Sequence, residues 1–136
     1  MLTSSEKRDY ILRMIAQIRQ MVEALVGKAR QGEDTAELQA QARESLAGLL
    51  GPMADVAQRL DSASAAQMVN DPDILFAWAE VTAAEAEVHR AAGDAPSADA
   101  LSRRALELAL EAHQRTLRDV PDLLALIDRL RAQVGG

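Results

Sequence analysis

The sequence predicts an all-α fold, built of antiparallel helical hairpins in a tetratricopeptide-like bundle of about five to six helices. Alanine (27 residues) and leucine (18 residues) dominate its apolar half, and alanine has the highest helix propensity of all residues. The only aromatic residues are Tyr10, Phe76 and Trp78, so residues that favour strands are scarce. Apolar side chains also recur at three- and four-residue steps, which is the period of a helix with one buried face. We expect a single helical domain over residues 1–136.

The first helix has the strongest pattern. Thr3 and Glu6 stand three residues apart, as in a capping box. Apolar residues then form one stripe over about five turns, and Gly32 ends it. The stripe is Ile11, Met14, Ile15, Ile18, Met21, Val22, Leu25, Val26 and Ala29. Such a helix is about 40 Å long at 1.5 Å per residue, longer than those that follow. Part of its stripe is therefore available for a homodimer through the first helix.

A second helix, capped near Asp34, carries a weaker stripe that stops at Gly51-Pro52. Residues 1–51 are therefore expected to form a first helical hairpin. Pro52 suits the first turn of a third, short helix, where its missing N–H costs nothing. The apolar face of that helix would be Met53, Val56, Ala57 and Leu60. Beyond it, Ser64 is placed to cap a single turn, and residues 52–71 are interpreted as a connector.

Regular helix resumes with Asp71 as N-cap and Pro72 as the first helical residue, and it continues to about Ala92. Gly93-Asp94 breaks this helix, and Ser97 is expected to cap the next. Residues 72–118 therefore form a second hairpin, since a short turn between long helices makes them antiparallel. Val120-Pro121 begins a last helix within residues 119–136.

Small residues at fixed spacing give this second hairpin a family resemblance. Ala86 lies in its first helix, Gly93-Asp94 makes the turn, Ala98 follows, and Ala105-Leu106-Glu107-Leu108 comes later. This pattern resembles a tetratricopeptide repeat. The resemblance implies two closely packed helices and a protein-binding role. Ser102 departs from it, because an aromatic residue is typical at that position.

A second resemblance concerns the start of the chain. Asp9-Tyr10-Ile11-Leu12-Arg13-Met14-Ile15 resembles the opening of a family of small bacterial all-helical proteins of unknown function. Arginine also outnumbers lysine thirteen to two, which is typical of a GC-rich bacterial genome. Both observations favour a bacterial protein, and neither points to a reaction.

The net charge of −6 is unevenly distributed. Residues 52–95 contain eight acids and only Arg59 and Arg90, whereas the segments on either side are balanced. This excess is either a solvated acidic face or a surface for a basic partner segment. Nucleic-acid binding is disfavoured because it requires a cationic patch. Two short basic pairs, Lys7-Arg8 and Arg103-Arg104, are expected to be solvated.

The sequence lacks the motifs of common catalytic and cofactor-binding sites. There is no cysteine, no phosphate-binding glycine loop and no Gly-x-Ser-x-Gly turn. No signal peptide and no run of about 20 apolar residues is present, so we expect a cytoplasmic protein without a membrane span. We therefore expect no cofactor, no metal and no enzymatic activity.

The preferred functional hypothesis is a non-enzymatic interaction module or scaffold that binds a protein or peptide, one of basic character if the acidic face is the binding surface. The residues expected on that face are Trp78, Glu80, Glu85, Glu87 and His89. Methionines at helical spacing could line a peptide groove, although such residues are more often core. These methionines are Met14, Met21, Met53 and Met68.

Two alternatives remain. One is a bundle that binds a small ligand or a metal, if His89 and Glu85 converge with His113 and Glu111 from the facing helix. Otherwise His89 is a half-buried residue that bonds to Glu85. The other alternative is a structural subunit that only associates with itself.

Overall fold

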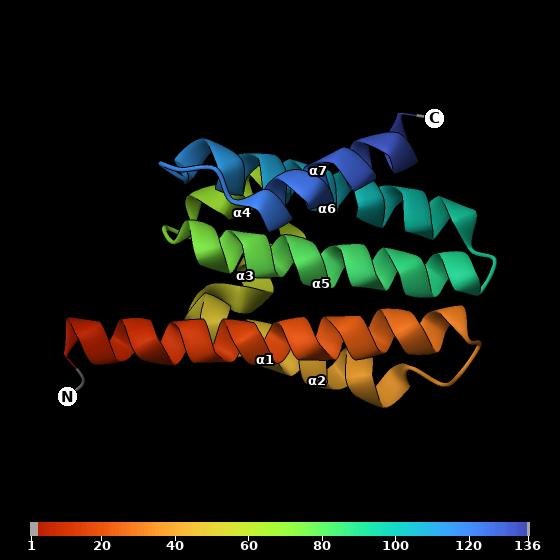
Figure 1. Cartoon of the computed structure of the whole chain (residues 1–136), viewed down its shortest axis with the longest axis horizontal. Helices are drawn as coiled ribbons and strands as arrows, with labels where there is room; N and C mark the ends of the chain where they lie inside the picture. Colours follow the sequence, from red (N-terminus) through yellow and green to blue (C-terminus); the bar gives the residue numbers. More distant parts are fainter. Residues whose placement is uncertain (1–2, 136) are drawn as a thin grey trace.

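The computed structural model describes residues 3–135, and this part of the chain contains helices and no strand. It confirms the all-α prediction, with five long helices and two of six residues each (Figure 1). In chain order the elements are α1 (Ser4–Arg30), α2 (Ala36–Leu50), the 3₁₀ turn η1 (Gly51–Met53), α3 (Ala54–Arg59), α4 (Ser62–Gln67), α5 (Pro72–Ala91), α6 (Ala95–Arg115) and α7 (Pro121–Val134).

The predicted N-cap residues are confirmed at the starts of two helices and are wrong at the starts of two others. The Thr3 hydroxyl accepts a hydrogen bond from the Glu6 backbone N–H at 3.1 Å, and Asp71 caps α5 with Pro72 as its first residue. The predicted caps Ser64 and Ser97 are wrong by three residues. Asp61 caps α4 and Asp94 caps α6, each accepting a bond from the backbone N–H of the predicted serine. A carboxylate one turn upstream therefore takes the capping role in both helices.

Three of the long helices run in the same direction, α1, α5 and α7, and their antiparallel partners α2 and α6 return the chain (Figure 1). Helix α5 is the centre of the fold, because it packs against α6, α1, α2 and α7. Eleven of its twenty residues are buried. Helix α5 therefore belongs mainly to the core.

The α5–α6 hairpin has the most extensive contact between two helices in the described chain. Ala86, Ala98 and Ala105 are all fully buried, and side chains this small let two backbones approach. Gly93 adopts φ +82° at the turn, a conformation that favours glycine. Ser102 is also fully buried, and its hydroxyl bonds to the Arg90 guanidinium at 3.2 Å. The position where an aromatic residue is typical thus holds a hydrogen-bonded hydroxyl.

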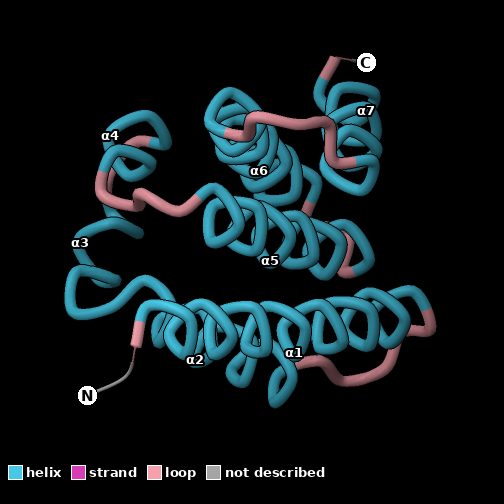
Figure 2. Tube along the Cα trace, turned by 60° about the vertical axis from the view of Figure 1, so that its left-hand side comes forward, coloured by secondary structure: helices cyan, strands magenta, loops and turns pink. Residues whose placement is uncertain are grey.

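The predicted connector folds into η1, α3 and α4, which lie at the end of the molecule where α5 begins (Figure 2). Arg104 of α6 donates from Nη1 to the Leu60 carbonyl at 2.9 Å and from Nη2 to the Ala57 carbonyl at 3.3 Å. The prediction that Arg104 is solvated is therefore wrong. Arg115 likewise bonds the carbonyls of Ala66 and Val69, at 2.7 and 2.6 Å. Two arginines of α6 thus satisfy the carbonyls at the ends of two short helices.

The apolar face predicted for the third helix is only half correct. Ala57 is buried, but Met53 and Val56 are exposed, at 49% and 44%. Because α3 ends at Arg59 after six residues, it covers less of the core than its sequence pattern indicates. None of the helices between residues 3 and 135 is long and apolar enough to cross a membrane.

Candidate functional site

The acidic residues expected to face a partner are instead paired within the protein. Glu80 accepts from Arg19 Nε at 3.2 Å, Glu85 from Arg43 Nε at 2.7 Å, and Glu87 from Arg90 Nη1 at 3.0 Å. Their side chains keep only 14–21% of their exposure. Arg19 and Arg43 belong to α1 and α2, so the pairs that they make join the first hairpin to α5.

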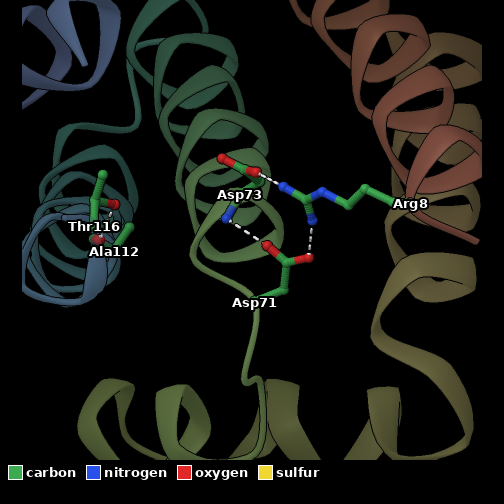
Figure 3. Close-up of polar contacts among 5 residues, drawn as sticks. All are labelled: Arg8, Asp71, Asp73, Ala112 and Thr116. Carbon is green, nitrogen blue, oxygen red and sulfur yellow. Dashed lines mark hydrogen bonds and ion pairs between the residues drawn. The ribbon is translucent and has the colours of Figure 1, made fainter. Parts of the chain in front are cut away.

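A fourth cation extends the same pattern to the start of α5. Figure 3 shows Arg8 reaching from α1 to the carboxylates of Asp71 and Asp73, while Asp71 also accepts from the Asp73 backbone N–H. Burial lowers the pKa of Arg8, but attraction to Asp71 and Asp73 outweighs this and raises it overall. Arg8 is therefore ion-paired, although its side chain stays 43% exposed to solvent as predicted. Half of the eight acids in residues 52–95 thus pair with arginines of α1 and α2, namely Asp71, Asp73, Glu80 and Glu85.

Trp78 and His89 also differ from their predicted roles. Trp78 is only 3% exposed, with the Arg104 guanidinium 5.3 Å from its ring centre. The prediction that Trp78 lies on an exposed partner-binding face is therefore wrong. His89 is half-buried, but its Nδ1 lies 3.3 Å from Asp94 Oδ2 and makes no bond to Glu85. Because Asp94 caps α6, the contact belongs to the helix turn.

The two histidines do not converge. His89 precedes the Gly93 turn by four residues, whereas His113 follows it by twenty. At 1.5 Å per residue the two positions differ by about 24 Å along the antiparallel hairpin. Among residues 3–135 no group of three His, Asp or Glu side chains is placed to hold a metal ion. The alternative in which His89 and His113 converge on one site is therefore wrong.

A groove of about 540 Å³ runs between α1, α5 and α7. Its apolar lining comes from all three helices: Val22, Val26, Phe76, Ala83, Ala84 and Leu126. Two features keep it hollow. Helix α5 carries alanines at 83 and 84, and Gly27 of α1 has no side chain. A Cβ atom at Gly27 would have no other atom within 4 Å.

Charged side chains surround this apolar lining: Arg19, Glu23, Arg30, Glu80, Glu87, Asp122 and Arg129. Among these side chains, Arg19 contacts three other residues. It pairs with Glu80, lies 3.5 Å from Asp122 Oδ2 across the groove on α7, and stacks 4.8 Å from the centre of the Phe76 ring. Burial raises the pKa of Glu80, and the attraction of Arg19 opposes that shift. The groove therefore contains a carboxylate that is costly to ionise.

A smaller hollow of about 230 Å³ lies near the start of α5, lined by Ile11, Leu49, Leu50 and Met68 among others. Met68 is thus the one methionine of the four that lines either hollow. The hypothesis that all four methionines line one peptide groove is therefore wrong. The homodimer through the first helix stays a prediction.

Comparisons with protein-family models, curated proteins and solved structures found no match to this chain. The two family resemblances therefore stay predictions based on their residues. The α1–α5–α7 groove includes only two of the five residues predicted for the partner-binding face, Glu80 and Glu87. One signal for the groove was present in the sequence, namely Gly27 within a long helical stripe, where glycine is unfavourable.

Proposed function

We propose that this protein is an interaction module that binds a segment of another protein in the groove between α1, α5 and α7. The observation that carries the proposal is an open groove lined by both apolar and charged side chains. Along α1 it extends from Arg19 to Arg30, which is about 16 Å at 1.5 Å per residue. This length suits about five residues of an extended segment or three turns of a helix.

The chemistry of the groove favours binding over catalysis. Its described lining supplies carboxylates, guanidinium groups, one amide and apolar side chains, with no serine, threonine, lysine or histidine. The usual covalent nucleophiles other than carboxylates are thus missing from the lining. Glu80, the carboxylate with a raised pKa, already accepts a hydrogen bond from Arg19. The tetratricopeptide resemblance of residues 72–118 supports the same class of function.

Filling the groove tests this proposal. Gly27→Phe places a ring on the α1 side, and Ala125→Phe places one on the α7 side, where Ala125 is exposed. Gly48→Phe is the matched control, because Gly48 is an exposed glycine of α2 that lies outside the groove. A Cβ atom at Gly48, as at Gly27, would have no other atom within 4 Å.

Proteins captured from a lysate by the wild type and by the control should be lost with both groove variants. Circular dichroism should show that all three variants remain helical. Capture that is unchanged by Gly27→Phe and Ala125→Phe would rule out this groove as the binding site.

A further inference from the structure

We infer that the segment bound in the α1–α5–α7 groove is acidic, the opposite of the basic partner that the composition of residues 52–95 indicates. This inference rests on the proposed function and specifies the chemistry of the partner. It follows from which charges along the groove are already used by contacts within the protein.

Three of the four acidic residues of the groove already contact an arginine of the protein. Glu80 and Asp122 both lie within ion-pair distance of Arg19, at 3.2 and 3.5 Å. Glu87 accepts from Arg90 at 3.0 Å and from the Gln133 side-chain amide at 3.1 Å. Only Glu23 has no ion-pair partner among residues 3–135. A basic segment would therefore meet Glu80 and Glu87 already paired, while Asp122 shares Arg19 with Glu80 and stays 75% exposed.

Two cations, by contrast, make no ion pair within the described chain, although the charge of Arg129 opposes the rise that burial gives to the pKa of Glu80. Arg30 on α1 and Arg129 on α7 line opposite sides of the groove, and both residues are exposed. Within the described chain neither lies within 4.0 Å of a carboxylate oxygen. A guanidinium group binds a carboxylate through two parallel hydrogen bonds. Arg30 and Arg129 are thus the cations of the groove without an ion pair, while on the acidic side Glu23 has none and Asp122 shares Arg19 with Glu80.

The apolar lining determines what accompanies the acids. Val22, Val26 and Leu126 also line the groove, and they would cover apolar side chains of the segment. Two available arginines are few for a nucleic acid, whose binding depends on many phosphate contacts. The groove therefore fits a short protein segment in which acidic residues flank apolar ones.

Selection from a random peptide library tests the charge of the segment. The full-length wild type would be the target, and peptides that also bind Gly27→Phe would be discarded. Asp and Glu are expected to be enriched next to apolar residues. Enrichment of Lys and Arg would overturn the acidic assignment and leave the groove as the binding site. A selection that returns no peptide sensitive to Gly27→Phe would overturn the proposed function as well.

Charge-removal variants test the two arginines with a selected peptide, by fluorescence anisotropy. We expect the double variant Arg30→Gln/Arg129→Gln to bind at least tenfold more weakly than the wild type. The control Arg13→Gln/Arg131→Gln removes the same charge from exposed positions of the same helices outside the groove. It should change the affinity less than twofold. Equal losses in the two double variants would show that net charge alone acts, and would contradict the assignment of Arg30 and Arg129.

Discussion

Arg104 shows how one side chain can hold a segment that has little core of its own. Its guanidinium bonds to the Leu60 and Ala57 carbonyls and to the Ser62 hydroxyl, and it also stacks on Trp78. These contacts place α3 and α4 against α6. The neighbouring Arg103 is exposed, and the two residues form a matched pair for measurement.

Arg104→Ala is expected to lower the free energy of unfolding by about 2 kcal/mol, because two partly buried carbonyls lose their donor. Arg103→Ala should change it by less than about 0.5 kcal/mol. Urea denaturation followed by circular dichroism measures both values. Similar values for the two variants would show that the bonds of Arg104 contribute little to stability.

Glu80 gives a prediction about pH. Burial raises its pKa in the folded protein above the ordinary value of 4.5, so the folded state binds the proton more tightly than the unfolded state. The resulting stabilisation is fully present below pH 4.5 and is lost as the pH rises through the raised pKa. The stability of the wild type relative to Glu80→Gln should therefore fall as the pH increases over this range. Paired denaturation curves at several pH values measure the difference, and a difference that grows with pH would contradict the assignment.

At the scale of the helices, two glycines have opposite roles. Gly93 turns the chain between α5 and α6 at φ +82°, whereas Gly27 lies inside α1 with open space around it and no positive φ. The first glycine is required by its backbone conformation. The second is unfavourable for its helix and leaves the groove open.

The same substitution should therefore have opposite effects at these positions. Gly93→Ala is expected to cost about 1–2 kcal/mol, because a Cβ atom disfavours the left-handed conformation. Gly27→Ala should raise the free energy of unfolding by at most about 1 kcal/mol, because alanine has a higher helix propensity than glycine. Thermal unfolding of the two variants gives the sign of each change. Stabilisation by Gly93→Ala would mean that the turn relaxes to another conformation.

Helices with strong local signals could be predicted from the sequence. The starts of α1 and α5 follow from Thr3 and Asp71, whose side chains cap backbone groups two or three residues away. The folding of the connector could not be predicted in this way, because α3 and α4 depend on Arg104 and Arg115 more than 40 residues later. The burial of Trp78 could not be predicted for a related reason: α5 is surrounded by other helices, and its own pattern does not show which helices cover it.

At the scale of the molecule, charge guides the assembly of the two hairpins. Arg8, Arg19 and Arg43 of the first hairpin all meet acids at or in α5. Composition alone indicates that the surplus acids form a surface. Neither their pairing nor the groove could be predicted, since each requires the relative positions of helices far apart in the sequence.

A double-mutant cycle measures this complementarity. Arg43 and Glu85 are suitable because Arg43 remains largely exposed and their contact joins α2 to α5. Comparing Arg43→Gln, Glu85→Gln and the double variant should give a coupling energy of about 0.2–1 kcal/mol in low salt. It should decrease at a salt concentration of about 1 M, where charges are screened within about 3 Å. A coupling energy that is zero in low salt would assign the pair no part in stability.

The parallel course of α1, α5 and α7 also determines where the two ends of the described chain lie. Thr3 is at the start of α1 and Gly135 follows the end of α7, so they stand at opposite ends of the bundle (Figure 1). The 27 residues of α1 span about 40 Å at 1.5 Å per residue. Joining the ends in a circular permutant would need a linker of about twelve residues or more, even fully extended. Fluorophores attached at the two ends would therefore be held apart by the length of the bundle, and their energy transfer would report directly on its unfolding.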